Sequence, residues 1–271
     1  MFYKTKMTHY LLASQFAIAG CLFAPNIMAN EVAAPVAEAS TEVSADVSDV
    51  EVAASSVLEQ MSTYLASQQK FEITAHTSIE SMLDSGQKIM LDSTSRVAVQ
   101  RPNKLFSTRQ GNIIDQNFYY DGRSLTLYNN KAKVFATVAA PDTVSKTLDY
   151  TLAEFKLIAP GIDLLHTDIA TRLSKGLLSG FYAGKAMIAG VECHHLAFRN
   201  EEVDWQIWVQ TGDQPLPKKY IITSRWTTGA PQYSITMDWN LKPSFNDSLF
   251  NFSAPSDAKK VEIQAALPDA P

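Results

Sequence analysis

The chain has 271 residues, of which 46% are hydrophobic and 10% aromatic, so it has enough apolar material for one or two domains with a real core. Its formal net charge is −5, with 23 basic and 28 acidic residues, which argues against binding to nucleic acid or to an anionic membrane surface. No Lys or Arg occurs between Lys6 and Lys70, whereas acidic residues recur from Glu31 to Glu51. The acidity therefore belongs to the N-terminal region.

Residues 1–29 have the organisation of a secretory signal peptide. Lys4 and Lys6 form a positive region, residues 11–24 form an apolar stretch too short to span a bilayer, and Ala29 is a small residue suited to cleavage. A second interpretation stays open, because residues 18–21 (IAGC) resemble the lipobox of bacterial lipoproteins, in which the cysteine, here Cys21, is lipidated. Both interpretations predict export without a transmembrane helix in the mature protein, and the second adds a membrane anchor.

The remaining chain divides by composition into three parts. Residues 30–52 are rich in Ala, Val, Ser and Glu and are predicted to be a disordered acidic tail or tether. Residues 53–255 form the predicted domain, and residues 256–271 a loose C-terminal tail. Cys193 is the only cysteine of the predicted domain, so no disulfide is expected within it.

The first half of the domain combines one helix with a strand meander. Apolar residues repeat helically over residues 53–67, and the helix is followed by segments with a period of two. Turns at Asp121-Gly122 and Asn129-Asn130 are expected to supply the positive φ that tight hairpins need. The predicted strands are residues 71–80, 88–100, 104–110, 116–120, 124–128 and 134–138.

A helical insert interrupts the strands. Leu148, Leu152 and Phe155 stand at i, i+4 and i+7, which predicts a helix over residues 143–158 that Pro160-Gly161 stops. We expect one or two further short helices in residues 162–173 and a loose segment from Ser244 onward. With its apolar stripe, the insert is a candidate plug for the concave face of a curled sheet.

Residues 177–240 resume the period of two and contain every tryptophan of the chain. In residues 203–209 the apolar side chains share one face, and Trp208 is predicted to face the other way. The same alternation continues in the later strands. The side chains expected to line a concave, ligand-binding wall are Trp205, Ile207, Tyr220, Ile222, Trp226, Tyr233, Ile235, Met237 and Trp239. For each of them, ordinary core packing against the helices is the alternative.

Motifs for catalysis are absent from the sequence. There is no Gly-x-Ser-x-Gly, His-Glu-x-x-His or Gly-rich phosphate loop, and Glu201-Glu202 reads as a solvated turn. Cys193-His194-His195 is the one chemical cluster, but alternation along a strand puts only Cys193 and His195 on the same side. We therefore expect a buried cysteine and two hydrogen-bonded histidines, with no metal, no cofactor and no enzymatic activity.

Several segments of the domain resemble a bacterial family of predicted periplasmic proteins of unknown function. They are residues 99–103, 118–122, 125–128, 135–138, 193–198, 204–208, 215–219 and 230–233. More distantly, the layout is similar to the periplasmic lipoprotein carriers and their outer-membrane receptor, which have an unclosed half-barrel whose helices cover a cavity for acyl chains. No individual ligand contact is carried over from them.

The residues and the resemblance together predict an α+β fold. A curled antiparallel sheet of about 10–11 strands forms an unclosed half-barrel, and helices cover its concave face. We expect an exported binding protein of the Gram-negative periplasm whose partner is a lipid or an acylated lipoprotein. The alternative is an envelope protein-interaction or sensor module with the same fold.

Overall fold

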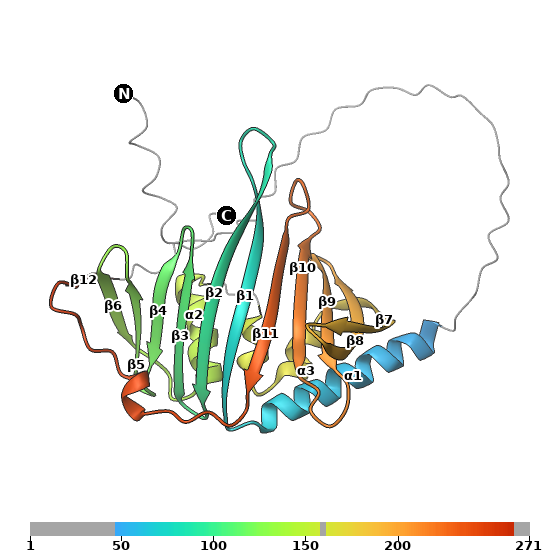
Figure 1. Cartoon of the computed structure of the whole chain (residues 1–271), viewed down its shortest axis with the longest axis horizontal. Helices are drawn as coiled ribbons and strands as arrows, with labels where there is room; N and C mark the ends of the chain where they lie inside the picture. Colours follow the sequence, from blue (N-terminus) through green and yellow to red (C-terminus); the bar gives the residue numbers. More distant parts are fainter. Residues whose placement is uncertain (1–46, 158–160, 263–271) are drawn as a thin grey trace.

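Twelve strands lie side by side in one open sheet in the computed structural model, which describes residues 47–157 and 161–262 (Figure 1). The predicted signal peptide, Cys21 and the predicted tail as far as residue 46 lie outside these residues, as do residues 263–271. The helical segments are α1 (Val47–Ser67), α2 (Val144–Phe155), η1 (Ile162–Leu165), α3 (Ile169–Ser174) and η2 (Asp247–Phe250). The strands are β1 (Lys70–Met82), β2 (Lys88–Gln100), β3 (Lys104–Gly111), β4 (Asp115–Tyr120), β5 (Ser124–Asn129), β6 (Val134–Ala139), β7 (Leu177–Ile188), β8 (Val191–Asn200), β9 (Val203–Gln210), β10 (Pro217–Ser224), β11 (Gln232–Asn240) and β12 (Lys259–Lys260).

The strand order is β12-β6-β5-β4-β3-β2-β1-β11-β10-β9-β8-β7. All neighbours are antiparallel except β12 and β6, which are parallel, and within the described residues β12 and β7 remain the two edges. β1 lies at the centre because it pairs with β2 on one side and with β11 on the other, with Ile73 opposite both Val97 and Trp239. The prediction of a curled, unclosed half-barrel is confirmed, and the two-residue β12 is the strand beyond the predicted number.

Alternation along the strands puts one apolar face of the sheet against the helices. Phe71, Ile73 and Ala75 of β1 belong to this core, as do Leu196 of β8 and Ile207 of β9. Residues of α1, α2, η1 and α3 join the same cluster, so all four segments lie on the concave face. Burial of apolar surface stabilises the protein by about 25 cal/mol per Å² and is the main force that holds the helices against the sheet.

Three predicted details of the first half are corrected. α1 begins at Val47, earlier than residue 53. In the β5–β6 turn the positive φ falls on Lys133 rather than on Asn129-Asn130, because the Asn129 side chain instead accepts a hydrogen bond from the Ala132 amide. α2 ends at Phe155 because Lys156 adopts the left-handed conformation and its amide donates to the Leu152 carbonyl, so Pro160-Gly161 does not stop it.

The segment after Ser244, expected to be loose, is docked as far as residue 262. Phe250 of η2 is fully buried and packs with Ala98 and Phe106 on the outer face of the sheet. Phe252 contacts the rings of Tyr119, Tyr128 and Phe135, and β12 then pairs with β6. The C-terminal segment therefore acts as a strap that buries the outer face of the β2–β6 half.

Candidate functional site

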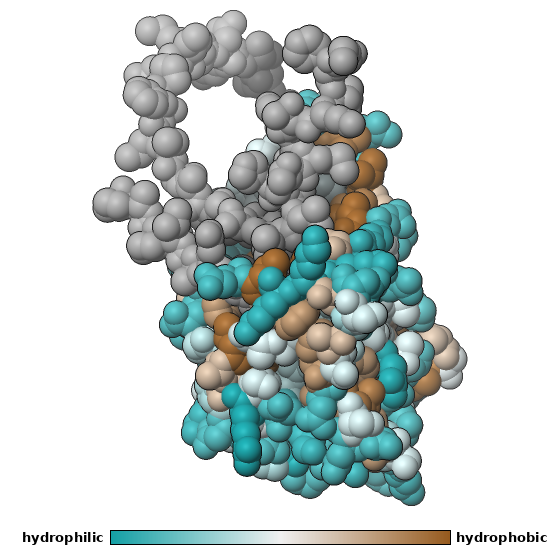
Figure 2. Space-filling model, turned by 90° about the vertical axis from the view of Figure 1, so that its left-hand side faces the viewer, coloured by the Kyte–Doolittle hydropathy of each residue, from teal (hydrophilic) through white to brown (hydrophobic). Residues whose placement is uncertain are grey.

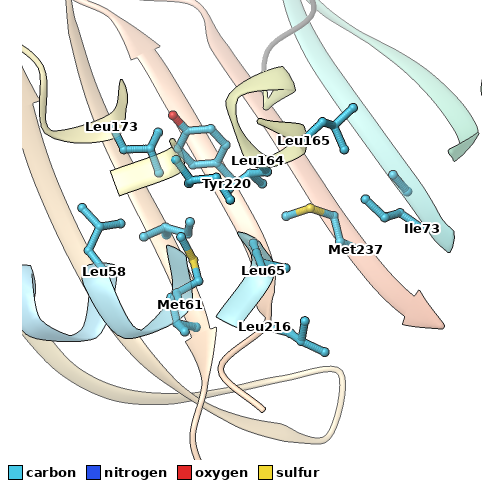
Figure 3. Close-up of a cluster of buried hydrophobic side chains, with 14 of the residues drawn as sticks. Leu58, Met61, Leu65, Ile73, Leu164, Leu165, Leu173, Leu216, Tyr220 and Met237 are labelled. Carbon is cyan, nitrogen blue, oxygen red and sulfur yellow. The ribbon is translucent and has the colours of Figure 1, made fainter. Parts of the chain in front are cut away.

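The concave face of the β7–β11 half is the place where sheet and helices meet most closely. Figure 3 shows Tyr220 and Met237 of the sheet among Leu65 of α1 and Leu164 of η1. α1 lies along β7, β8 and β9 and contacts α3, which in turn contacts η1. We call α1, η1 and α3 the cover.

Side chains fill the covered part of the concave face. Trp205, Ile207, Tyr220 and Met237 are all buried in the core cluster. Two hollows of the described residues lie elsewhere. One of about 610 Å³ lies between α1 and the loop at Gly212, and one of about 230 Å³ lies beside the C-terminal strap. A ligand that reaches the concave wall must therefore displace the cover.

Most of the predicted wall residues lie where the alternation places them. Ile222, Ile235 and Trp239 are partly buried and pack against the core cluster beside the four fully buried residues. Burial raises the pKa of the Tyr220 and Tyr233 hydroxyls above the ordinary value for tyrosine. Whether any of these residues contacts a ligand stays a prediction.

Trp226 is the exception, and its predicted place in the wall is wrong. Its side chain is 69% exposed, and its indole N–H donates to the Glu201 carbonyl. The guanidinium of Arg225 lies over its ring at 4.9 Å. The reason is that β10 ends at Ser224, so the alternation that placed Trp226 inward no longer applies beyond that residue.

A half-buried apolar strip continues from the covered wall toward the ends of the central hairpins. In the register, Ile79 of β1 lies opposite Leu91 of β2 and Tyr233 of β11, and Tyr233 lies opposite Ile222 of β10. Directly opposite residues share a face, so these side chains form one row across four strands on the concave side. We call Ile79, Leu91, Ile222 and Tyr233 the apolar strip. Ile79 and Leu91 are not among the wall residues predicted from the sequence, although the alternation of apolar residues in β1 and β2 could have identified them.

The predicted inward face of the insert helix is also corrected. Leu148 is buried, but Leu152 is 47% exposed, and Phe155 packs edge-on against Tyr150. The buried residues of α2 are Val144, Thr147, Leu148 and Thr151. Two of them are threonines whose hydroxyls donate to backbone carbonyls, those of Pro141 and Leu148, so polar side chains take positions that the pattern assigned to solvent.

α2 lies on the concave face, where the insert was expected, but against the first half of the sheet. The Val144 amide donates to the Pro102 carbonyl, and the Tyr120 hydroxyl donates to the Pro141 carbonyl, which ties the start of α2 to the β2–β4 half. The elements that cover the aromatic wall of the second half are therefore α1, η1 and α3.

Arg101, in the turn between β2 and β3, ties the cover to the sheet. Its guanidinium donates to the carbonyls of Gln68 just after α1, of Leu165 in η1 and of His166, at 3.0–3.1 Å. It also lies 5.6 Å from the centre of the Phe71 ring. Burial lowers the pKa of Arg101, yet a guanidinium in this range stays charged, and three charge-assisted bonds from one side chain hold α1 and η1 together.

The side chains of the Cys193-His194-His195 cluster lie on both faces of the sheet. His195 stacks on Trp208 at 4.2 Å on the outer face and bonds Gln206, while His194 bonds the Tyr182 hydroxyl on the other face, as alternation predicted. Burial raises the pKa of the Cys193 thiol, which disfavours a reactive thiolate.

Within residues 47–157 and 161–262, no three His, Cys, Asp or Glu side chains are grouped to hold a metal ion. Those residues also contain no helix that is both long and apolar enough to cross a bilayer.

The fold is an unclosed half-barrel with one apolar face covered by helices. The chain belongs to the family described as "Predicted periplasmic protein (DUF2092)", which matches residues 54–264. A search of curated proteins found no match.

Similar solved structures share the layout at low identity. An uncharacterized conserved protein from Thermus thermophilus has a TM-score of 0.46 at 8% identity and covers 78% of this chain and 99% of its own. The Mycobacterium tuberculosis lipoprotein LppX has a TM-score of 0.41 at 10% identity, with coverages of 72% and 100%. A LolA superfamily protein from Nitrosomonas europaea has a TM-score of 0.35 at 12% identity, with coverages of 73% and 97%. At these values the similarities carry no argument about ligands.

Proposed function

We propose that the protein is a non-enzymatic binding protein of the cell envelope that holds a lipid, or the acyl chain of a lipoprotein, on its concave face. The observation that carries the proposal is the apolar strip, because it extends the buried wall to the rim of the half-barrel. Burial of each CH₂ group of an acyl chain contributes about 0.8 kcal/mol. An acyl chain that enters along the strip would then take the place of the cover's leucine and methionine side chains.

The test is acyl binding by delipidated protein, measured by native mass spectrometry and with a fluorescent fatty acid. We expect Ile79→Asp to weaken binding at least about tenfold, because a carboxylate in the strip must lose its hydration when a chain covers it. The matched control is Ile113→Asp, since Ile113 is 68% exposed in the β3–β4 turn. Absence of acyl binding in the unaltered protein would contradict the proposal.

A second candidate is an envelope protein-interaction or sensor module. It is favoured by exposed apolar side chains at two neighbouring hairpin ends: Met82, Leu83 and Met90 of the β1–β2 hairpin and Trp226 after β10. Figure 2 shows brown, apolar side chains at the top of the molecule, where this hairpin projects. A stoichiometric protein partner, recovered from envelope extract equally well by the unaltered protein and by Ile79→Asp, would support this function over lipid binding.

The N-terminal region determines how the protein is held in the envelope. We propose that residues 1–29 are removed on export to the Gram-negative periplasm and that the acidic residues 30–46, which precede α1, become the N-terminal tail of the mature protein. Mass spectrometry of the mature N-terminus is expected to show Asn30 as the first residue. A diacylglycerol adduct on Cys21 would contradict cleavage after Ala29 and would make the protein a membrane-anchored lipoprotein.

A further inference from the structure

His166 lies where the cover meets the sheet. It is the residue that ends η1, and its amide donates to the Asp163 carbonyl at 3.2 Å. Its own carbonyl accepts a hydrogen bond from Arg101 at 3.1 Å. A change at His166 therefore acts at the point where η1, α3 and the Arg101 clamp come together.

The imidazole of His166 is buried without a full set of partners. Its side chain is only 2% exposed, and Nδ1 is a buried atom without a hydrogen-bond partner in the described residues. Asp168 Oδ1 is 3.9 Å from Nδ1, which is too far for a hydrogen bond. Buried polar atoms are almost always paired, and a neutral ring tolerates such a site far better than a charged one.

The charges around His166 do not favour a cationic ring. Arg101 approaches from the sheet, Asp149 from α2, Asp163 from η1, and Asp168 and Arg172 from α3. Arg172 already pairs with Asp168 at 2.8 Å and with Asp149 at 2.9 Å, so these carboxylates are largely neutralised. Asp168 is also half exposed, so solvent screening weakens the attraction between its carboxylate and a protonated His166 ring. Burial and the nearby Arg172 therefore outweigh the acids.

We propose that protonation of His166 loosens the cover, so that the concave face opens as the pH falls. The inference rests on the proposed function only for its consequence, which is acyl uptake favoured in acid. The opening itself is a property of the protein alone. Buried histidines that must gain a charge are common pH-dependent switches.

The direction of the pH effect follows from the burial of the ring. Burial and Arg172 hold the pKa of His166 below its ordinary value of about 6.5. The stabilisation of the closed cover is therefore complete above about pH 6.5 and is lost as the pH falls through the pKa of the closed form. Between these two pKa values, the population of the open form rises about tenfold for each pH unit.

The test is hydrogen exchange, corrected for intrinsic rates, of residues 161–174 at about pH 7.5 and about pH 5. In the unaltered protein, exchange of this segment is expected to rise at the lower pH, by up to about tenfold for each pH unit below about 6.5. In His166→Gln the rise should disappear, because glutamine does not titrate. The matched control is His194→Gln: burial also lowers the pKa of His194, but its ring bonds Tyr182 between β7 and β8 and lies outside residues 161–174, so this variant should keep the rise.

A histidine titration by NMR of the unaltered protein covers the case in which His166→Gln does not fold. One imidazole is then expected to titrate below its ordinary pKa together with amide shifts in residues 161–174. Exchange that is independent of pH in the unaltered protein, or a rise that persists in His166→Gln, would overturn the inference. Acyl binding that shows no pH dependence would overturn it and leave the proposed function intact. Acid-induced opening of the cover in a protein that binds no acyl chain would contradict the proposed function and leave this inference intact.

Discussion

Arg101→Met is expected to lower the free energy of unfolding by about 2–4 kcal/mol, because it leaves the carbonyls of Gln68, Leu165 and His166 without their charged donor. The main effect is on the cover, so acyl affinity should change as well. The apparent dissociation constant of a ligand that binds only the open form is divided by the fraction that is open. A closed form weakened by about 2 kcal/mol is therefore expected to bind a fatty acid about 30-fold more tightly.

The control for this variant is Arg96→Met. Arg96 forms an ion pair with Glu72 at 2.6 Å on the outer face, and its side chain is 45% exposed. Exposed pairs contribute about 0–1 kcal/mol, so Arg96→Met should have little effect on unfolding and none on acyl affinity. Urea denaturation and fluorescence titration measure both quantities. If the two variants behave alike, Arg101 does not hold the cover closed.

Leu148→Ala is expected to lower the free energy of unfolding by about 2–5 kcal/mol, because it leaves a cavity in the core cluster beneath α2. Leu152→Ala, one turn further along the same helix, should cost less than about 0.5 kcal/mol because Leu152 is 47% exposed. Urea denaturation followed by circular dichroism compares the two. A larger loss for Leu152→Ala would show that the apolar stripe of Leu148, Leu152 and Phe155 faces the sheet after all.

The strands could be predicted closely because one face of the sheet is buried. The predicted bounds of residues 88–100 are those of β2, and the predicted bounds of β1, β3, β4, β5 and β6 differ from the observed ones only at the ends. A one-residue slip would move every apolar side chain to the wrong face, so the period of two is a strong constraint. The same reasoning placed Trp208 correctly opposite Trp205 and separated His194 from His195.

The errors occur where a local pattern does not decide the outcome. Trp226 follows the end of β10, where the alternation stops. In α2 the hydroxyls of Thr147 and Thr151 donate hydrogen bonds to backbone carbonyls, so these polar side chains can be buried. Phe250 is buried by contact with Ala98 and Phe106, which are distant in sequence. No helical or strand period in the segment after Ser244 predicts that contact.

The Arg101 clamp could not be predicted for a related reason. Its acceptors are backbone carbonyls 33, 64 and 65 residues away, and carbonyls are present at every position. The sequence shows an arginine before a proline in a turn, which is compatible with an ordinary exposed side chain. Only the folded arrangement of α1, η1 and the sheet shows that one guanidinium connects them.

A lipid that binds the concave face is expected to displace the cover. Hydrogen exchange of delipidated protein, with and without a saturating fatty acid, tests this displacement most directly. We predict faster exchange in α1 and residues 161–174 when the fatty acid is bound, and slower exchange in β1, β10 and β11 beneath the chain. Binding that leaves α1 and residues 161–174 unchanged, or exchange that is the same with and without the fatty acid, would contradict the claim.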